Sequence, residues 1–220
     1  IVNLCKWASE GCMIACLNTA GRAAIDKKKI IEKARINRTI WYVRFKPLYW
    51  ARLVKEIKAL IRKAERMNLT PVIRLNGTSD QPFERIKIQG TEFDGLTLFE
   101  AFPNVQFYDY TKATYSERAS IPNNYHLTYS YSENTTLQML SDNLNNGRNV
   151  AVVFNICKLG NKGKCHNKCF CALPTTWNGY TVINGDESDI RFNDQSGVIV
   201  GLHAKGDARH DKSGFVVTIN

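Results

Sequence analysis

The fold class is decided by one stretch, which reads from residue 47 to residue 80 PLYWARLVKEIKALIRKAERMNLTPVIRLNGTSD. Residues 47–67 carry apolar side chains at the i, i+3 and i+4 spacing of an amphipathic helix, and Pro47 suits its first turn. Residues 72–75 form a short apolar run typical of a buried strand. A helix, a short connection, a strand and a polar loop in this order indicate an α/β protein with a mostly parallel sheet.

The rest of the chain continues this alternation. Further helical patterns cover residues 24–43 and 134–145, and further strand-like runs cover 105–108, 126–129, 150–154, 180–183 and 198–202. With one more strand before Cys5, this order predicts a single α/β domain over residues 1–220. We expect a partial or complete parallel (β/α) barrel, similar to a TIM barrel, with a cysteine-rich insertion at 157–171.

The positive charge of the chain is concentrated in one stretch. The 220 residues hold 30 Lys and Arg against 20 Asp and Glu, a net charge of +10. Residues 22–66 hold fifteen basic and four acidic residues, a balance of +11, so the remainder sums to −1. This stretch lies outside the predicted strand ends, and we expect it to dock nucleic acid or another acidic partner. No apolar run approaches the ~20 residues of a membrane span, so no membrane partner is expected.

Three cysteines near the start of the chain have a spacing that suits metal ligation. Cys5, Cys12 and Cys16 follow the pattern Cys-x6-Cys-x3-Cys. Three thiolates can bind three irons of a 4Fe–4S cluster and leave the fourth iron open for a ligand. A zinc site would need a fourth protein ligand from elsewhere. The alternative is three cysteines on a buried turn without metal.

A second cysteine group lies in the lysine- and glycine-rich insertion, where Cys157, Cys165, Cys169 and Cys171 fall within fifteen residues. Four thiolates can complete a zinc site or hold a second iron–sulfur cluster, and exposed thiols without metal are the alternative. Seven cysteines in two clusters without a secretory feature favour a reducing, cytoplasmic compartment over a disulfide framework.

Polar side chains follow most of the predicted strands, and in a parallel barrel such strand ends meet on one face. The catalytic candidates among them are Asp109, Lys112, Asp186, Asp189 and Lys205. The strand ends also carry Asn76, Ser79, Asp80, Ser130, Ser132, Glu133, Asn155 and His203. Arg74 lies within an apolar run, where burial would require a carboxylate partner such as Asp109. Helix caps, turns and structural ion pairs are the ordinary alternatives for these side chains.

Several ordered motifs carry a family resemblance. They are the run 12–22, Arg-Leu-Asn-Gly-Thr-Ser-Asp at 74–80, Phe-Tyr-Asp-Tyr-Thr-Lys at 107–112, Asn-Gly-Asp-Glu-Ser-Asp at 184–189 and Val-Gly-Leu-His-Ala-Lys-Gly at 200–206. With these motifs the chain resembles the gene product 88 family of phages and plasmids over nearly its whole length. The resemblance implies a phage or plasmid protein that acts inside a bacterial host, and it implies no particular reaction.

A more distant likeness is to radical S-adenosylmethionine enzymes. In that superfamily a three-cysteine loop, a helix and a strand ending in a glycine-bearing motif follow one another, as they do here. The usual cysteine spacing, Cys-x3-Cys-x2-Cys, is shorter than the one in this chain. The likeness implies a 4Fe–4S cluster on Cys5, Cys12 and Cys16. It also implies S-adenosylmethionine near a set of candidate residues, namely Asn76, Gly77, Ser79, Asp80 and Ser130.

Three functions stay open at this level. The first is an iron–sulfur enzyme that cleaves S-adenosylmethionine reductively to generate a radical. Its substrate is unknown, and a nucleic acid or another phage or host target is the candidate. The second is a metal-stabilised nucleic-acid-binding protein without catalysis, in which residues 22–66 contact phosphates and their aromatic side chains stack on bases. The third is a host-directed phage protein whose metals are structural.

Overall fold

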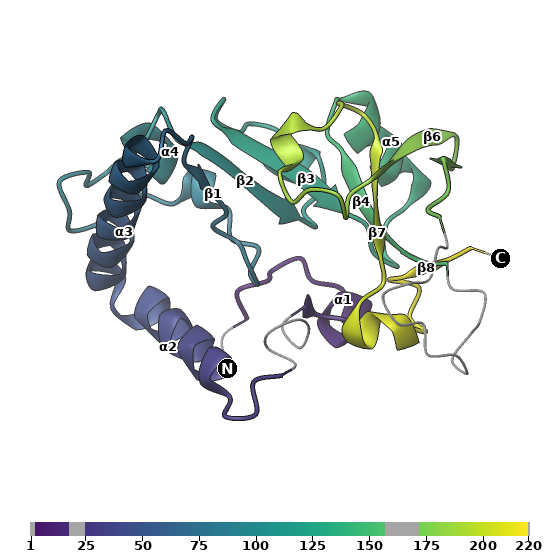
Figure 1. Cartoon of the computed structure of the whole chain (residues 1–220), viewed down its shortest axis with the longest axis horizontal. Helices are drawn as coiled ribbons and strands as arrows, with labels where there is room; N and C mark the ends of the chain where they lie inside the picture. Colours follow the sequence, from purple (N-terminus) through teal and green to yellow (C-terminus); the bar gives the residue numbers. More distant parts are fainter. Residues whose placement is uncertain (1–2, 18–24, 157–171, 220) are drawn as a thin grey trace. The chain divides into compact units, whose positions relative to one another are not determined.

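The computed structural model describes residues 3–17, 25–156 and 172–219 (Figure 1). Their contacts divide the chain into two compact units. As far as its residues are described, unit 1 consists of Ile1–Lys6, Ile25–Asp109 and Ser120–His126, and unit 2 consists of Trp7–Ala24, Tyr110–Ala119 and Leu127–Asn220. The expectation of a single domain stays a prediction, and each unit is described below by itself.

Two consecutive helices dominate unit 1. Helix α2 (Ile30–Arg44) and helix α3 (Lys46–Arg66) are separated by Phe45 alone (Figure 1). Helix α3 confirms the helix expected over 47–67, and its buried side chains are Trp50, Val54, Ile57 and Ala64. Helix α2 buries none of its side chains. The two helices therefore differ, because α3 packs on a core whereas α2 keeps its side chains at least partly accessible.

The rest of unit 1 is built around aromatic packing. Strand β1 (Val72–Ile73) pairs in parallel with strand β2 (Gln106–Thr111). The short helices η3 (Phe83–Arg85) and α4 (Leu98–Ala101) lie between them in sequence. Phe99 of α4 stacks on Tyr125 with ring centroids 4.4 Å apart. This packing and the buried face of α3 form the core that positions the strand-end loop after β1.

In unit 2, side chains pack against both faces of the strands. The main elements of this unit are α1 (Glu10–Ile14), β3 (Tyr125–Ser130, of which the first two residues belong to unit 1), α5 (Leu137–Asn145), β4 (Val150–Asn155), β5 (Thr176–Trp177), β6 (Tyr180–Asn184), β7 (Ile199–His203) and β8 (Val217–Thr218). Leu140 and Leu144 of α5 pack with Val152 of β4 in one cluster. Val153 packs against a second cluster that includes Ala15, just after α1. Adjacent strand residues point to opposite faces, so β4 is covered on both sides. Unit 2 also contains short 3-10 helices of three to five residues, namely η4 (Ser116–Arg118), η6 (Arg191–Asn193) and η7 (Gly206–His210).

The sheet is mostly parallel and open. Its strand order is β1-β2-β3-β4-β7-β6-β5, with β8 paired to β4 beside this path. The pairs β1–β2, β3–β4, β4–β7, β6–β7 and β4–β8 are parallel, and β5–β6 is antiparallel. The expected α/β class is confirmed, whereas the barrel is not, because no pairing among the described residues closes the sheet. Barrel closure requires matched strand number, tilt and stagger, which local sequence patterns do not set.

All six strand-like runs named above correspond to strands, with shifts of up to three residues at their ends. Sequence patterns missed β5 and β8, which have two residues each. Of the strand expected before Cys5, the described residues show a single parallel bridge between Cys5 and Asp80. The cysteine-rich insertion at 157–171 lies outside the described residues. None of the described helices has the length and apolar character needed to cross a membrane.

Candidate functional site

The loop after β1 is held in place by a buried carboxylate. Asp109 is fully buried, and its Oδ1 accepts a hydrogen bond of 2.7 Å from the backbone N–H of Asn76. Its Oδ2 accepts hydrogen bonds from Nδ2 of Asn76 at 3.2 Å and from the hydroxyl of Tyr125 at 2.9 Å. Asn76 in turn accepts, through Oδ1, from Ser79 Oγ and from the backbone N–H of Gln81. The Asp109–Asn76 pair therefore fixes the course of the loop.

Gln81 connects this loop to helix α2 and to the start of the chain. Its Nε2 donates to the carbonyl oxygen of Leu4 at 2.7 Å, and its Oε1 accepts from the hydroxyl of Tyr42 at 3.2 Å. The backbone N–H of Asp80 also donates to Leu4. Because these bonds link three parts of unit 1, the loop and α2 form a preorganised wall.

That wall lines an open cavity of about 380 Å³, which we name the arginine pocket. Its described lining is Leu4, Arg35, Arg38, Thr39, Tyr42, Tyr49, Arg74, Leu75, Gly77, Thr78, Ser79, Gln81 and Phe83. Three guanidinium groups and three aliphatic hydroxyl groups belong to this set, and no described lining residue is acidic. Such a lining favours an anion, because arginine offers paired N–H donors that match phosphate or carboxylate oxygens.

The two tyrosines of the arginine pocket stay protonated near neutral pH. Burial, reinforced by the nearby Tyr42 and Glu56, raises the pKa of Tyr49 to about 12, against a smaller lowering by Arg38. Burial also raises the pKa of Tyr42. The phenols therefore add no negative charge to compete with an anionic ligand, and their rings offer flat apolar surface.

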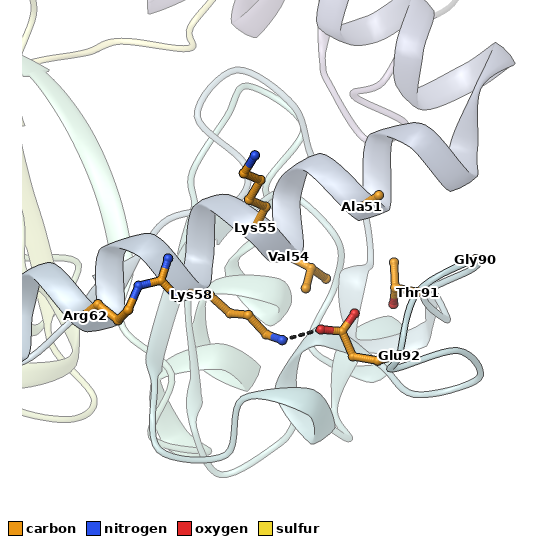
Figure 2. Close-up of a pocket in the computed structure, with 8 residues that line it drawn as sticks. All are labelled: Ala51, Val54, Lys55, Lys58, Arg62, Gly90, Thr91 and Glu92. Carbon is orange, nitrogen blue, oxygen red and sulfur yellow. Dashed lines mark hydrogen bonds and ion pairs between the residues drawn. The ribbon is translucent and has the colours of Figure 1, made fainter.

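A second basic cavity lies along α3, and we name it the α3 groove. It has a volume of about 320 Å³ and is lined by Ala51, Val54, Lys55, Lys58, Arg62, Gly90, Thr91 and Glu92. Figure 2 shows the three cationic side chains along the helix and the ion pair between Lys58 and Glu92. The spacing 55, 58 and 62 places the cations on one side of α3. One carboxylate against three cations leaves this groove positive.

Sequence-predicted residues of unit 1 gather at this site in different roles. Gly77 and Ser79 line the arginine pocket, whereas Asn76 and Asp109 lie buried behind it. Asp80 is buried and joins the loop to the first residues through its backbone. Arg74 was expected within a buried strand, but β1 ends at residue 73, so Arg74 is exposed and lines the pocket.

The basic stretch was expected to lie away from the strand ends, and the structure corrects this. Arg35, Arg38, Thr39 and Tyr42 line the same pocket as the loop after β1. Their spacing of i, i+3, i+4 and i+7 marks one helix face, a pattern usually sought in apolar residues. A search for this helical spacing among the polar side chains of residues 24–43 would have found this face of α2.

In unit 2, three predicted residues come together at the ends of β6 and β7. Asp186 Oδ1 accepts from Lys205 Nζ at 2.6 Å, and Asp186 Oδ2 lies 2.6 Å from Nδ1 of His203. The backbone N–H of His203 donates to the same Oδ2. Burial alone would raise the pKa of the Asp186 carboxyl, but the hydrogen bonds from Lys205 and His203 outweigh it and lower the pKa. The cluster ties two neighbouring parallel strands together at their carboxyl ends.

This cluster makes stability depend on acidity in a defined direction. Because folding lowers the pKa of the Asp186 carboxyl, its negative charge stabilises the fold at pH values above 3.8, the ordinary pKa of aspartate. This stabilisation is lost as the pH falls through the pKa of the folded state. We expect Asp186→Asn to lower the melting temperature at pH 6 and to differ less from the parent below pH 3.8. Thermal unfolding at pH 6 and pH 3 measures both, with the exposed Asp189→Asn as the control. An equal difference at both pH values would contradict the role of the carboxylate charge.

The other predicted polar residues of unit 2 are placed separately. Lys112 Nζ donates to Ser130 at its carbonyl and hydroxyl oxygens, each at 3.0 Å, and to the carbonyl of Tyr131. The Lys112 ammonium also lies over the ring of Phe215. Asp189 is exposed. Lys112 and Ser130 therefore meet each other, in an arrangement that anchors β3.

The described cysteines do not show a metal site. Cys5 belongs to unit 1, and its Sγ donates to the carbonyl of Thr78, whereas Cys12 and Cys16 belong to unit 2. Among the residues that the structure describes, no group of three or more His, Cys, Asp or Glu side chains could hold a metal ion. Cys157, Cys165, Cys169 and Cys171 lie outside those residues. Metal ligation by either cluster stays a prediction.

Comparison with protein families matches the model described as gene product 88 over residues 1–219 of this chain. Neither curated proteins nor solved structures gave a match. The match supports the first resemblance drawn from the sequence motifs, whereas the similarity to radical S-adenosylmethionine enzymes is not supported.

Proposed function

We propose that this chain, which belongs to the gene product 88 family, binds single-stranded nucleic acid through the basic side of unit 1. The observation that carries the proposal is the arginine pocket, whose described lining combines three guanidinium groups with two tyrosine rings and no carboxylate. Phosphates provide the negative charge that such a lining favours, and exposed bases provide flat faces for stacking.

Helix α3 also carries basic side chains outside the pocket. It contributes Tyr49 to the arginine pocket and Lys55, Lys58 and Arg62 to the α3 groove. These cations lie on the side of α3 roughly opposite Tyr49, so a strand that occupies the pocket would have to cross the helix to bring other phosphates to them. Binding of this kind releases counterions, so it weakens steeply as salt is added.

The shape of the pocket favours a single strand over a duplex. A cavity of about 380 Å³ can admit one nucleotide at a time. In a duplex the bases are stacked and paired, so they cannot reach tyrosine rings inside a cavity without being unstacked. We therefore expect tighter binding of a single strand than of a duplex of the same sequence.

The proposal is tested by titrating a fluorescent single-stranded oligonucleotide at several salt concentrations. We expect Arg62→Gln to reduce the magnitude of the slope of log affinity against log salt by about 0.7, the value for one lost phosphate contact. Lys212→Gln is the matched control, because it also removes one exposed positive charge but belongs to unit 2. It should leave the slope nearly unchanged.

Three results would contradict this function. They are the absence of oligonucleotide binding at low salt, an affinity that does not change between 50 and 200 mM salt (roughly the range over which phosphate contacts weaken strongly), and equal effects of the two variants. A duplex bound as tightly as the single strand would contradict the part of the proposal that concerns unpaired bases.

The iron–sulfur enzyme expected from the cysteine spacing stays a prediction. Nothing among the described residues groups its ligands, and the pocket that the structure does show is lined by cations rather than thiolates. The binding function does not depend on a cluster, so the two ideas can be tested separately.

A further inference from the structure

We propose that the arginine pocket binds the terminal phosphate of a nucleic-acid strand, so that the protein recognises strand ends that carry a phosphomonoester. This inference rests on the proposed binding of single strands and adds which part of the strand occupies the pocket.

The described lining of the pocket holds more positive charges than an internal phosphodiester holds negative ones. A phosphodiester inside a strand carries one negative charge, whereas a terminal phosphomonoester carries about −1.5 to −2 near pH 7. Arg35, Arg38 and Arg74 all line the cavity, and no described lining residue contributes an opposing carboxylate. A doubly charged group with three outer oxygens is the ligand that matches such a lining.

Neutral donors surround the same space. Thr39 and Thr78 line the cavity beside the arginines, and the phenol of Tyr49 stays protonated because its pKa is raised to about 12. Hydroxyl groups can donate to the oxygens of a phosphate that the guanidinium groups leave unsatisfied. An internal phosphodiester has only two non-bridging oxygens, whereas a terminal phosphomonoester has three. The phosphodiester would therefore accept fewer hydrogen bonds from the guanidinium and hydroxyl groups.

The size of the cavity fits one terminal nucleotide. Its volume of about 380 Å³ lies near the lower end of the roughly 300–1,000 Å³ range of small-molecule sites. Leu75 and Phe83 add apolar surface next to the tyrosines. A nucleotide with a phosphate among the arginines could therefore set its base or sugar against this apolar part of the lining.

The loop that contributes residues 77–79 is rigid before any ligand arrives. Asn76 and Asp109 hold it from behind, and Gln81 connects it to Tyr42 of α2. A preorganised site loses less entropy on binding than a mobile one. At Gly77 an added Cβ would meet no other atom within 4 Å, so no neighbouring side chain covers the backbone at this position.

The test compares three versions of one single-stranded oligonucleotide, which carry a 5′-phosphate, a 3′-phosphate or hydroxyl groups at both ends. We expect one phosphorylated version to bind at least about tenfold more tightly than the hydroxyl-ended strand. The two phosphorylated versions show which end is recognised. Arg38→Gln and Arg74→Gln should each weaken the preferred phosphorylated strand more than the hydroxyl-ended strand, and so remove most of this preference.

Both arginines are exposed, so their replacement should leave the fold intact, which thermal unfolding checks. Arg62→Gln is the matched variant outside the pocket, and it should weaken all three strands by the same factor. Equal affinity for all three strands, or a preference that survives both pocket variants, would overturn the inference. Salt-dependent binding in that case would still support the proposed function, whereas the absence of any binding would reject both.

Discussion

Replacing Asp109 with alanine is expected to lower the free energy of unfolding by about 3 kcal/mol or more, the largest effect of any polar substitution at the site. The carboxylate is fully buried and accepts hydrogen bonds from the N–H and the side chain of Asn76 and from Tyr125. Alanine would leave these donors buried without their acceptor, and the desolvation cost of each would no longer be offset.

The same substitution should weaken nucleic-acid binding, although Asp109 does not line the arginine pocket. Without it, Asn76 loses the partner that fixes the loop, and residues 77–79 lose their preorganised position. We expect Asp109→Ala to lower affinity for the strand with the preferred terminal phosphate more than for the hydroxyl-ended strand.

Tyr125→Phe is the control for this prediction. It removes the hydrogen bond that Tyr125 donates to Asp109 and keeps the two from Asn76 as well as the aromatic stack on Phe99. Its expected cost is about 1–2 kcal/mol, because one acceptor oxygen of the carboxylate retains other donors. Denaturant unfolding measures both variants. A cost below about 1 kcal/mol for Asp109→Ala would show that the hydrogen-bond network does not stabilise unit 1.

Local structure could be predicted from the sequence where one apolar period dominates. The helix expected at 47–67 is α3, since four of its side chains pack on one core face. The strand expected at 150–154 is β4, which is buried along most of its length. In such segments the burial of apolar side chains decides the structure, and the sequence displays that burial directly.

Pairing between distant strands could not be predicted in the same way. Strand β7 lies between β4 and β6, although it follows both in sequence, and the described strands leave the sheet open. Both an open sheet and a barrel bury the same apolar runs, so periodicity does not distinguish them. The difference depends on strand tilt and stagger over the whole sheet.

The site was found only in part from the sequence, for a related reason. Gly77 and Ser79 were predicted because they follow a strand, and they do line the pocket. Arg35 and Arg38 were assigned only to a basic face, because helix α2 buries no side chain and its apolar period is weak. Their approach to the loop after β1 depends on how α2 is held by Gln81, which is a tertiary contact.

Trp50→Ala is expected to cost about 3–5 kcal/mol of folding free energy, whereas Trp50→Phe should cost only about 1–2 kcal/mol. Trp50 is 1% exposed and contacts the rings of Tyr49 and Phe83. The indole N–H has no hydrogen-bond partner among the described residues, so phenylalanine loses volume but no hydrogen bond. Alanine removes nearly the whole side chain and leaves a cavity beneath α3.

The effect of Trp50 should extend to the arginine pocket through the aromatic rings that it supports. Tyr42 packs on both Tyr49 and Phe83, and all three of these rings line the pocket. Because Trp50 backs Tyr49 and Phe83 from the core, its loss should let the pocket wall relax. We therefore expect weaker binding of the phosphate-ended strand in Trp50→Ala than in Trp50→Phe, measured under conditions where both variants are folded. Equal affinities in the two variants would show that the aromatic core stabilises unit 1 without shaping the pocket.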